Sequence, residues 1–296
     1  SLQSLTIGSN TFGSIQSLDL SSTNTFNSIS IGSGSFSGVE SLRVGNSSIQ
    51  VLRAFGLADY SSGECFWLSG QSLLGNVKTM EIVSNTFNSF TSFSIEGVSK
   101  LQTLTIGSSS FRGNANAVAS FRIANCSSLN SVTVGSGSFL YYTSVVVTDT
   151  ASLHSLSLGN GVFSSTVRME MRSVGLESIT LANGQFPKLE SLVLNGMNRL
   201  RSVRVGTGNG VTIHDDGVFS VSNCPIISSI VIGNGSFRNC TEMTISNNPA
   251  LTSVELGESS FYQAQTAEFS SSPCIILERR FDFSPEYSSR RLRSSW

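Results

Sequence analysis

The sequence predicts a repeat solenoid, mainly of β-structure and of the leucine-rich-repeat or parallel β-helix type. A short pattern, apolar-x-apolar-Gly, recurs at intervals near 24 residues, as between Ile7 and Ile31. Between successive copies lies a second apolar-x-apolar pair, the first being Leu18 and Leu20. A phenylalanine follows most copies of the first pattern, as Phe12 follows Ile7. Together these features predict two strand ladders and about eleven coils of about 24 residues each.

Each coil is expected to contribute one short strand from each series, because alternate side chains of a strand point to the same side. The first series is Leu5/Ile7, Ile29/Ile31, Met80/Ile82, Leu104/Ile106, Val132/Val134, Leu156/Leu158, Ile179/Leu181, Val203/Val205, Ile230/Ile232 and Val254/Leu256. The second is Leu18/Leu20, Leu42/Val44, Phe93/Ile95, Phe121/Ile123, Val145/Val147, Met169/Met171, Leu192/Leu194, Phe219/Val221, Met243/Ile245 and Ala267/Phe269. Gly- and Ser-rich segments between the strands are expected to form the turns.

The recurrent phenylalanines are expected to form one column. Coils stacked at about 4.8 Å would bring their rings into contact, and each coil buries its apolar edge only against its neighbours. An aromatic ligand-binding stripe is the alternative. A second column is predicted for asparagines that come two residues after a second-series strand, where stacked side-chain amides can bond one another. These are Asn46, Asn125, Asn223 and Asn247.

The composition excludes some partners. Charged residues make up 12% of the chain, with 18 Lys and Arg against 19 Asp and Glu, so no basic field would attract nucleic acid. No apolar run is long enough to span a membrane. The five cysteines are scattered without metal-ligand spacing, and we expect them to be small buried residues of the repeat. We therefore predict no metal, no cofactor and no catalytic residue.

One coil carries a family resemblance. The stretch "IGNGSFRNCTEMTI", residues 232–245, resembles the I-G-x-x-A-F-x-x-C-x-x-L repeat of BspA-like leucine-rich-repeat proteins, with the motif cysteine matched at Cys240. "NNPALTSVELG" continues it as L-x-x-V-x-L-G, and the pattern covers the chain from Leu2 to about Phe269. The resemblance implies a secreted or surface-exposed protein of bacteria or protists that adheres to other cells, matrix or host proteins. The family has no catalytic residues to transfer.

The expected organisation is one solenoid over 1–270, followed by a C-terminal cap or tail over 271–296. Two places interrupt the repeat: an irregular coil at 54–78 and an insertion at 206–218. Because core positions are already committed, function in repeat arrays resides on outward strand faces and in such interruptions.

The outward face of the first series is mostly hydroxylated, with Thr105 and Thr133 at its centre. Such a ladder would suit a repetitive surface such as glycan or ice, although Thr and Ser also simply suit a solvated sheet. The irregular coil contains Tyr60, Phe66 and Trp67. These would contact a partner if exposed, or would pack inward if the coil is only distorted.

The insertion contains His214, Asp215 and Asp216, which would bind a partner or cation, or would simply form a surface turn. The leading hypothesis is a non-enzymatic extracellular or cell-surface module for adhesion or recognition, binding protein or glycan on another cell, matrix or assembly. One alternative is a structural building block of a larger extracellular assembly that self-associates through its solenoid ends. A β-solenoid polysaccharide-active enzyme using the two aspartates is a further alternative.

Overall fold

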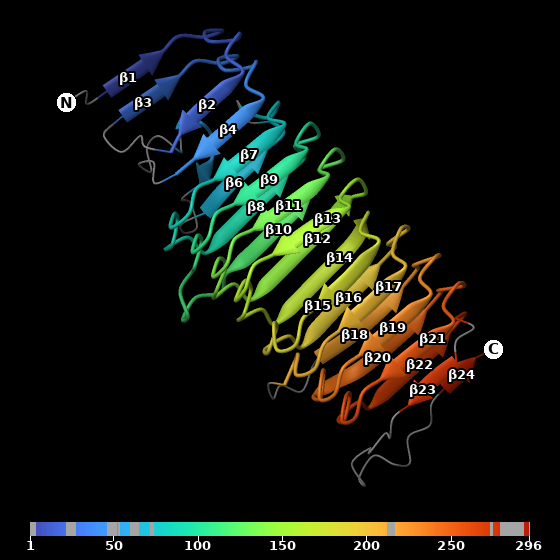
Figure 1. The fold of residues 1–296 in the computed structure, drawn as a ribbon. Coiled ribbons are helices and arrows are strands. Elements are labelled where there is room, and N and C mark those ends of the chain that lie inside the picture. Colours follow the sequence, from blue (N-terminus) through green and yellow to red (C-terminus); the bar gives the residue numbers. More distant parts are fainter. Residues whose placement is uncertain are drawn as a thin grey trace. The chain divides into compact units, whose positions relative to one another are not determined.

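The computed structural model describes residues 4–21, 28–45, 52, 54–59, 65–71, 74–211, 217–272, 275–278 and 293–295. They form short strands stacked as a β-solenoid of about ten coils (Figure 1). The predicted fold class, a mainly β repeat solenoid with two strand ladders, is confirmed. Within the described ranges, no helix is long and apolar enough to cross a membrane.

The chain divides into two compact units. The first contains Ser1–Tyr142 and Asp149–Phe163, and the second contains Thr143–Thr148 and Ser164–Trp296. Strand β12 (Ser144–Thr150) contributes residues to both units. In the second unit, successive strands along the chain alternate between two sheets, so that a coil supplies one strand to each, and the first unit follows the same alternation from β6 onward.

The first unit holds one six-stranded sheet, part of a longer sheet and a separate strand pair. The six strands are β2 (Ser17–Leu20), β4 (Ser41–Val44), β7 (Thr79–Ile82), β9 (Thr103–Ile106), β11 (Ser131–Val134) and β13 (Ser155–Leu158). The longer sheet contributes β5 (Ala58–Asp59), β6 (Cys65–Ser69), β8 (Ser92–Glu96) and β10 (Ser120–Ala124). The separate pair is β1 (Ser4–Ile7) and β3 (Ser28–Ile31).

The second unit repeats the arrangement. One sheet contains β15 (Ser178–Leu181), β17 (Ser202–Val205), β19 (Ser229–Ile232), β21 (Ser253–Leu256) and β23 (Ile275–Glu278). The other contains β14 (Arg168–Val174), β16 (Ser191–Asn195), β18 (Gly217–Ser222), β20 (Cys240–Ser246), β22 (Thr266–Ser270) and β24 (Arg293–Ser295). Strands β23 and β24 come from 271–296, the segment expected to cap or leave the solenoid.

Pairing is parallel and in register because each coil repeats its neighbour. Val132 of β11, for example, lies opposite Leu104 of β9 and Leu156 of β13. Burial alternates along β11, where Val132 and Val134 are 1% and 2% exposed and Thr133 is exposed. The irregular coil supplies an antiparallel pairing, in which β5 runs against β6.

The repeat changes phase in the first unit. Alignment on the Gly-containing pattern places Ile29/Ile31 in the same ladder as Met80/Ile82. That alignment is wrong, because β4 and not β3 pairs with β7, with Leu42 opposite Met80. The 46–78 segment contributes one strand to the parallel ladder of the longer sheet, β6, between β4 and β7. The turn that contains the glycine and the phenylalanine therefore follows β3 in the separate strand pair and β7 in the six-stranded sheet.

The predicted phenylalanine column is confirmed in part, because the rings stack in separate runs: Phe12 with Phe36, Phe87 through Phe111 and Phe139 to Phe163, and Phe237 with Phe261. Successive ring centroids lie 5.1 Å apart for Phe87 and Phe111, 5.2 Å for Phe111 and Phe139, and 5.6 Å for Phe237 and Phe261. Eight of these phenylalanines have a positive φ between 51° and 60°: Phe12, Phe36, Phe87, Phe111, Phe139, Phe163, Phe237 and Phe261. Phe186 does not, because it precedes Pro187, whose ring restricts the backbone of the residue before it.

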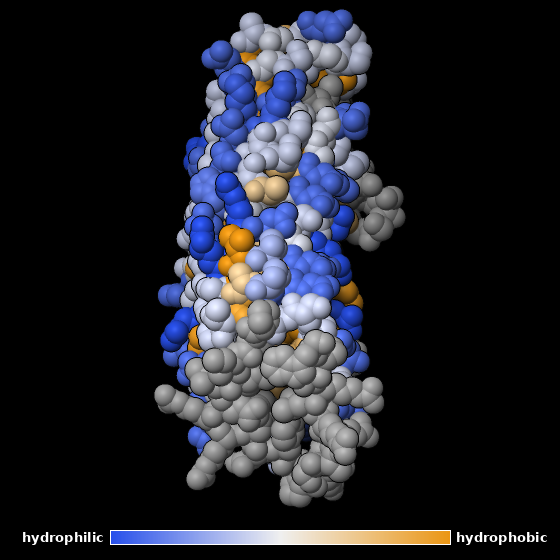
Figure 2. Space-filling view, turned by 90° about the vertical axis from the view of Figure 1, so that its right-hand side faces the viewer, coloured by the Kyte–Doolittle hydropathy of each residue, from blue (hydrophilic) through white to orange (hydrophobic). Residues whose placement is uncertain are grey.

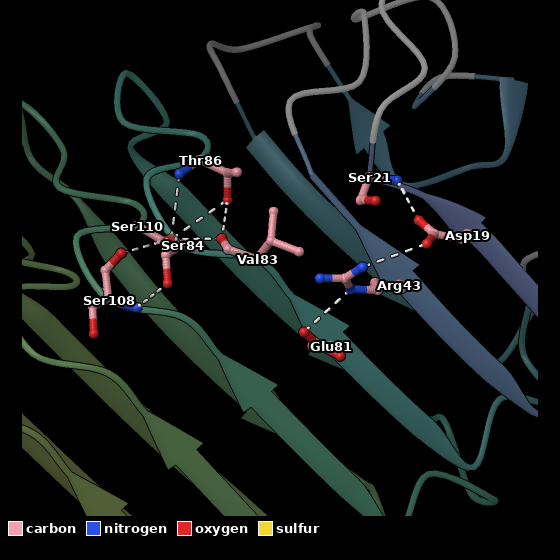
Figure 3. Close-up of polar contacts among 9 residues, drawn as sticks. All are labelled: Asp19, Ser21, Arg43, Glu81, Val83, Ser84, Thr86, Ser108 and Ser110. Carbon is pink, nitrogen blue, oxygen red and sulfur yellow. Dashed lines mark hydrogen bonds and ion pairs between the residues drawn. The ribbon is translucent and has the colours of Figure 1, made fainter.

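A buried hydroxyl column accompanies the phenylalanines and was not predicted. The residue before the ring is commonly Ser or Thr, and its side chain bonds the backbone of neighbouring coils. Ser110 Oγ donates to the carbonyl of Val83 at 3.0 Å and accepts from the amide of Thr86 at 3.3 Å (Figure 3). Ser138 Oγ likewise accepts from the Ser110 amide at 3.1 Å. These bonds satisfy turn amides and carbonyls that would otherwise be buried without partners.

The predicted asparagine ladder is confirmed in the second unit. Asn223 Nδ2 donates to Asn195 Oδ1 at 3.0 Å, and Asn247 Nδ2 donates to Asn223 Oδ1 at 3.2 Å. Asn125, Asn223 and Asn247 all have positive φ, a conformation that asparagine tolerates better than most residues. Asn46 lies outside the described residues. The ladder is structural, since its amides bond one another along the stack.

One buried hydroxyl has no partner. Thr150 at the end of β12 is fully buried, and within the described part of the chain its Oγ1 is the one buried side-chain oxygen or nitrogen without a hydrogen bond. We expect Thr150→Val to raise the free energy of unfolding by about 1 kcal/mol, since it removes an unsatisfied polar atom at similar volume. Urea denaturation followed by circular dichroism measures this. Thr150→Ser keeps the hydroxyl and loses a methyl group, and it should destabilise the chain. A loss of stability in the valine variant would contradict the assignment.

Candidate functional site

A groove of about 370 Å³ lies on the outward face of the six-stranded sheet in the first unit. It spans β2, β4, β7 and β9, and its polar lining includes Asp19, Arg43, Thr79, Glu81, Thr103 and Thr105. These side chains face outward because their strand neighbours, such as Leu42 and Met80, fill the core. Sequence repetition thus places a polar groove on a rigid apolar base.

The centre of the groove is a charge ladder. Parallel register sets Asp19 opposite Arg43 and Arg43 opposite Glu81. Arg43 Nη1 lies 3.5 Å from Asp19 Oδ2, and its Nε donates to Glu81 Oε1 at 3.2 Å (Figure 3). One guanidinium is therefore shared by two carboxylates. All three side chains are about half exposed, so each pair contributes well under about 1 kcal/mol to stability.

Asp19 is held ionised by its surroundings. Hydrogen bonds from Ser21, whose amide lies 2.8 Å from Oδ1, and the nearby Arg43 lower the pKa of this carboxyl below its usual 3.8. Because the folded state lowers this pKa, the pairing is complete above pH 3.8 and is lost as the pH falls below that value. The Asp19 carboxyl is thus charged at neutral pH.

A second ion pair lies beside the groove. Lys78 Nζ is 2.6 Å from Glu40 Oε1, and these residues directly precede β7 and β4. Three carboxylates, Asp19, Glu40 and Glu81, and two cations, Arg43 and Lys78, leave this region with a net charge of −1. The groove therefore offers charged donors and acceptors without attracting anions.

Hydroxyl groups continue the same outward row. Glu81 lies opposite Thr105, Thr105 opposite Thr133, and Thr133 opposite Ser157. The predicted residues Thr105 and Thr133 are exposed, and Thr105 lines the groove. Asp19 and Arg43 belong here too, although the sequence alignment put them on the other face. The phase change explains the error: the charges of both signs at these strand centres are visible in the sequence, but their pairing with Glu81 is not.

The aromatic residues of the irregular coil differ in burial. Phe66 is fully buried, and its ring stacks on Phe93 with centroids 5.4 Å apart. The expectation that Phe66 contacts a partner is therefore wrong, and its inward packing is the alternative stated for this coil. Trp67, the next residue in β6, faces outward and is 42% exposed. Tyr60 lies outside the described residues.

The insertion site cannot be placed in the same way, because His214, Asp215 and Asp216 lie outside the described residues. Within the ranges that are described, no group of three or more His, Cys, Asp or Glu side chains is placed to hold a metal ion. Cys126, Cys224 and Cys240 are buried, as expected for small residues of the repeat. Burial raises the pKa of all three thiols, that of Cys240 to about 12, so they stay protonated.

On the face drawn in Figure 2, hydrophilic residues dominate and hydrophobic residues form small separate areas.

Comparison with protein-family models, with curated proteins and with solved structures finds no significant match. The geometry of the chain itself must therefore support any functional proposal.

Proposed function

We propose that the chain is a non-enzymatic extracellular or cell-surface recognition module that binds protein or glycan on another cell, matrix or assembly. The observation that carries the proposal is the groove, where Arg43 is shared by Asp19 and Glu81 beside exposed threonines. The groups are preorganised by in-register strands, which lowers the entropy lost on binding.

The chemistry of the groove favours a neutral glycan over a protein surface. A sugar hydroxyl both donates and accepts, and the groove supplies carboxylates that accept, a guanidinium that donates and hydroxyls that do either. Hydrogen bonds to charged groups are the stronger kind. The local net charge of −1 gives no attraction for sulfated or phosphorylated polymers.

Arg43→Gln tests the proposal. The substitution removes the shared charge, and we expect it to weaken binding of neutral oligosaccharides on a glycan array, followed by calorimetry, about tenfold. Arg204→Gln is the matched control, since Arg204 is also the outward central residue of its strand, β17, but lies in the second unit. If the two variants bind alike, the groove is not the binding site.

A structural role remains the second candidate because of one feature of the first coil. Phe12 is 50% exposed, although its ring stacks on Phe36 with centroids 5.2 Å apart. A further coil packed on this ring, from the same chain or from a second copy, would cover it and extend the column. Sedimentation velocity at rising concentration tests this candidate: self-association that Phe12→Ser abolishes would support it, and a monomer at every concentration would contradict it.

A further inference from the structure

Trp67 is an exposed aromatic side chain that lies outside the groove. Its strand alternates strictly, with Phe66 and Leu68 fully buried on either side, so the indole lies on the outward face of the sheet that contains β6, β8 and β10. The burial of the core is complete without it. Trp67 therefore presents a large apolar ring to solvent from a rigid backbone position.

The surface beside Trp67 is small and polar. Register places Ser94 of β8 opposite Trp67 and Arg122 of β10 opposite Ser94. Two strand spacings of about 4.8 Å separate the Cα atoms of Trp67 and Arg122 by about 10 Å, and only the short Ser94 side chain stands between them in that row. The row beside the indole therefore carries only a short side chain before Arg122.

Charged hydrogen-bonding groups border this row: Arg122 lies on the far strand β10, and Glu96 lies on β8, two residues after Ser94. Arg122 Nη2 lies 4.0 Å from Glu96 Oε1, and both side chains are nearly half exposed. Arg122 donates and Glu96 accepts, and Ser92 and Ser94 are only half buried on the same face. An exposed indole thus stands beside small hydroxylated residues and an ion pair.

This combination selects the ligand class. An apolar peptide side chain would displace the water that hydrogen-bonds to the serines and to the ion pair, and it would offer these groups no hydrogen bonds in return. A polyanion gains little, because Glu96 neutralises Arg122. A pyranose ring fits both parts, since its C–H face packs on the indole and its hydroxyl rim meets donors and acceptors.

We propose that Trp67, Ser94, Arg122 and Glu96 form a binding site for a single pyranose ring of a neutral glycan. The site lies on a different sheet from the groove, so it does not depend on the function proposed for the groove. Both sites belong to the first unit.

Trp67 fluorescence provides a direct readout. The chain has two tryptophans, so Trp296→Phe leaves Trp67 as the single tryptophan whose fluorescence is followed. We would titrate this variant with neutral hexasaccharides of β-1,4-linked glucose, N-acetylglucosamine, xylose and mannose, and with a sulfated hexasaccharide. At least one neutral sugar is expected to give a saturable blue shift. The proposal is overturned if none does, or if only the sulfated sugar responds.

Calorimetry on three variants assigns the site. Trp67→Ala is expected to weaken binding of the responding sugar at least about tenfold, while Trp67→Phe retains part of the affinity because it keeps a ring. Arg204→Gln, which changes an outward strand-centre arginine of the second unit, should leave the affinity and the fluorescence shift unchanged. Equal affinity of Trp67→Ala and the parent chain would refute the site.

Discussion

Replacing Phe139 with alanine is expected to lower the free energy of unfolding by about 4 kcal/mol. The ring is fully buried at the centre of the phenylalanine column in the first unit. Its centroid lies 4.8 to 5.4 Å from the rings of Phe93, Phe111, Phe121, Tyr142 and Phe163. Alanine would remove all five contacts and leave a cavity that in-register strands on both sides cannot close. Urea denaturation followed by circular dichroism measures the loss.

The backbone of Phe139 makes a glycine control informative. Its φ is 55°, in the left-handed region that costs a residue with a Cβ about 1 kcal/mol and glycine almost nothing. Phe139→Gly should therefore be about 1 kcal/mol more stable than Phe139→Ala. Phe186 is equally buried but has no positive φ, and there glycine should be the worse replacement. The same order of Ala and Gly at both sites would show that strain at Phe139 is not relieved.

The fold could be predicted because its strands repeat a simple pattern. Inward pairs such as Val132/Val134 recur at a nearly constant interval, and a fixed interval with parallel register leaves little choice of architecture. The phase change could not be predicted, because strands of both series read as apolar-x-apolar. Pairing of Leu42 with Met80 rather than with Phe93 depends on how the irregular segment folds, and no period applies there.

The candidate site was predictable only in part, for the same reason. Thr105 and Thr133 were correctly placed outward, since strand alternation alone decides that. Their neighbours in the row, Asp19 and Arg43, required the correct strand pairing. Phe66 and Trp67 show a related limit, because composition marks both as interface residues and only the strand phase decides which one is buried. The hydrogen bonds of the buried serines depend on turn geometry. Because serine is common throughout the chain, the sequence did not single these serines out.

The glycine after most first-series strands starts a turn, as expected: the amide of Ser138, for example, donates to the carbonyl of Gly135 at 3.4 Å. The structure gives this glycine a second task. A Cβ on Gly135 would lie 2.4 Å from the amide nitrogen of Ser108 and 2.7 Å from the carbonyl carbon of Gly107. Similar approaches to the backbone of a neighbouring coil, all under 3 Å, occur at Gly32, Gly107, Gly159, Gly206, Gly233 and Gly257. None of these glycines has a positive φ, so the constraint is space and not backbone conformation.

Gly135→Ala is therefore expected to destabilise the chain by about 3 kcal/mol or more, because the atoms in the way are backbone atoms that already pair with other coils. The amide of Gly135 itself donates to the carbonyl of Ile106 at 2.8 Å, so moving either coil apart would weaken the ladder. Urea denaturation of the alanine variant measures the loss.

Gly161 is the matched control, since it lies near another turn of the first unit but has a φ of 70° and open space around its Cβ position. Alanine there should cost about 1 kcal/mol, from backbone strain alone. If Gly135→Ala and Gly161→Ala lose equal stability, close approach of the coils is not what requires the glycine. If Gly135→Ala loses about three times as much free energy of unfolding as Gly161→Ala, the glycine at the strand end sets the distance between coils. A side chain at that position would hold adjacent strands too far apart for their hydrogen bonds.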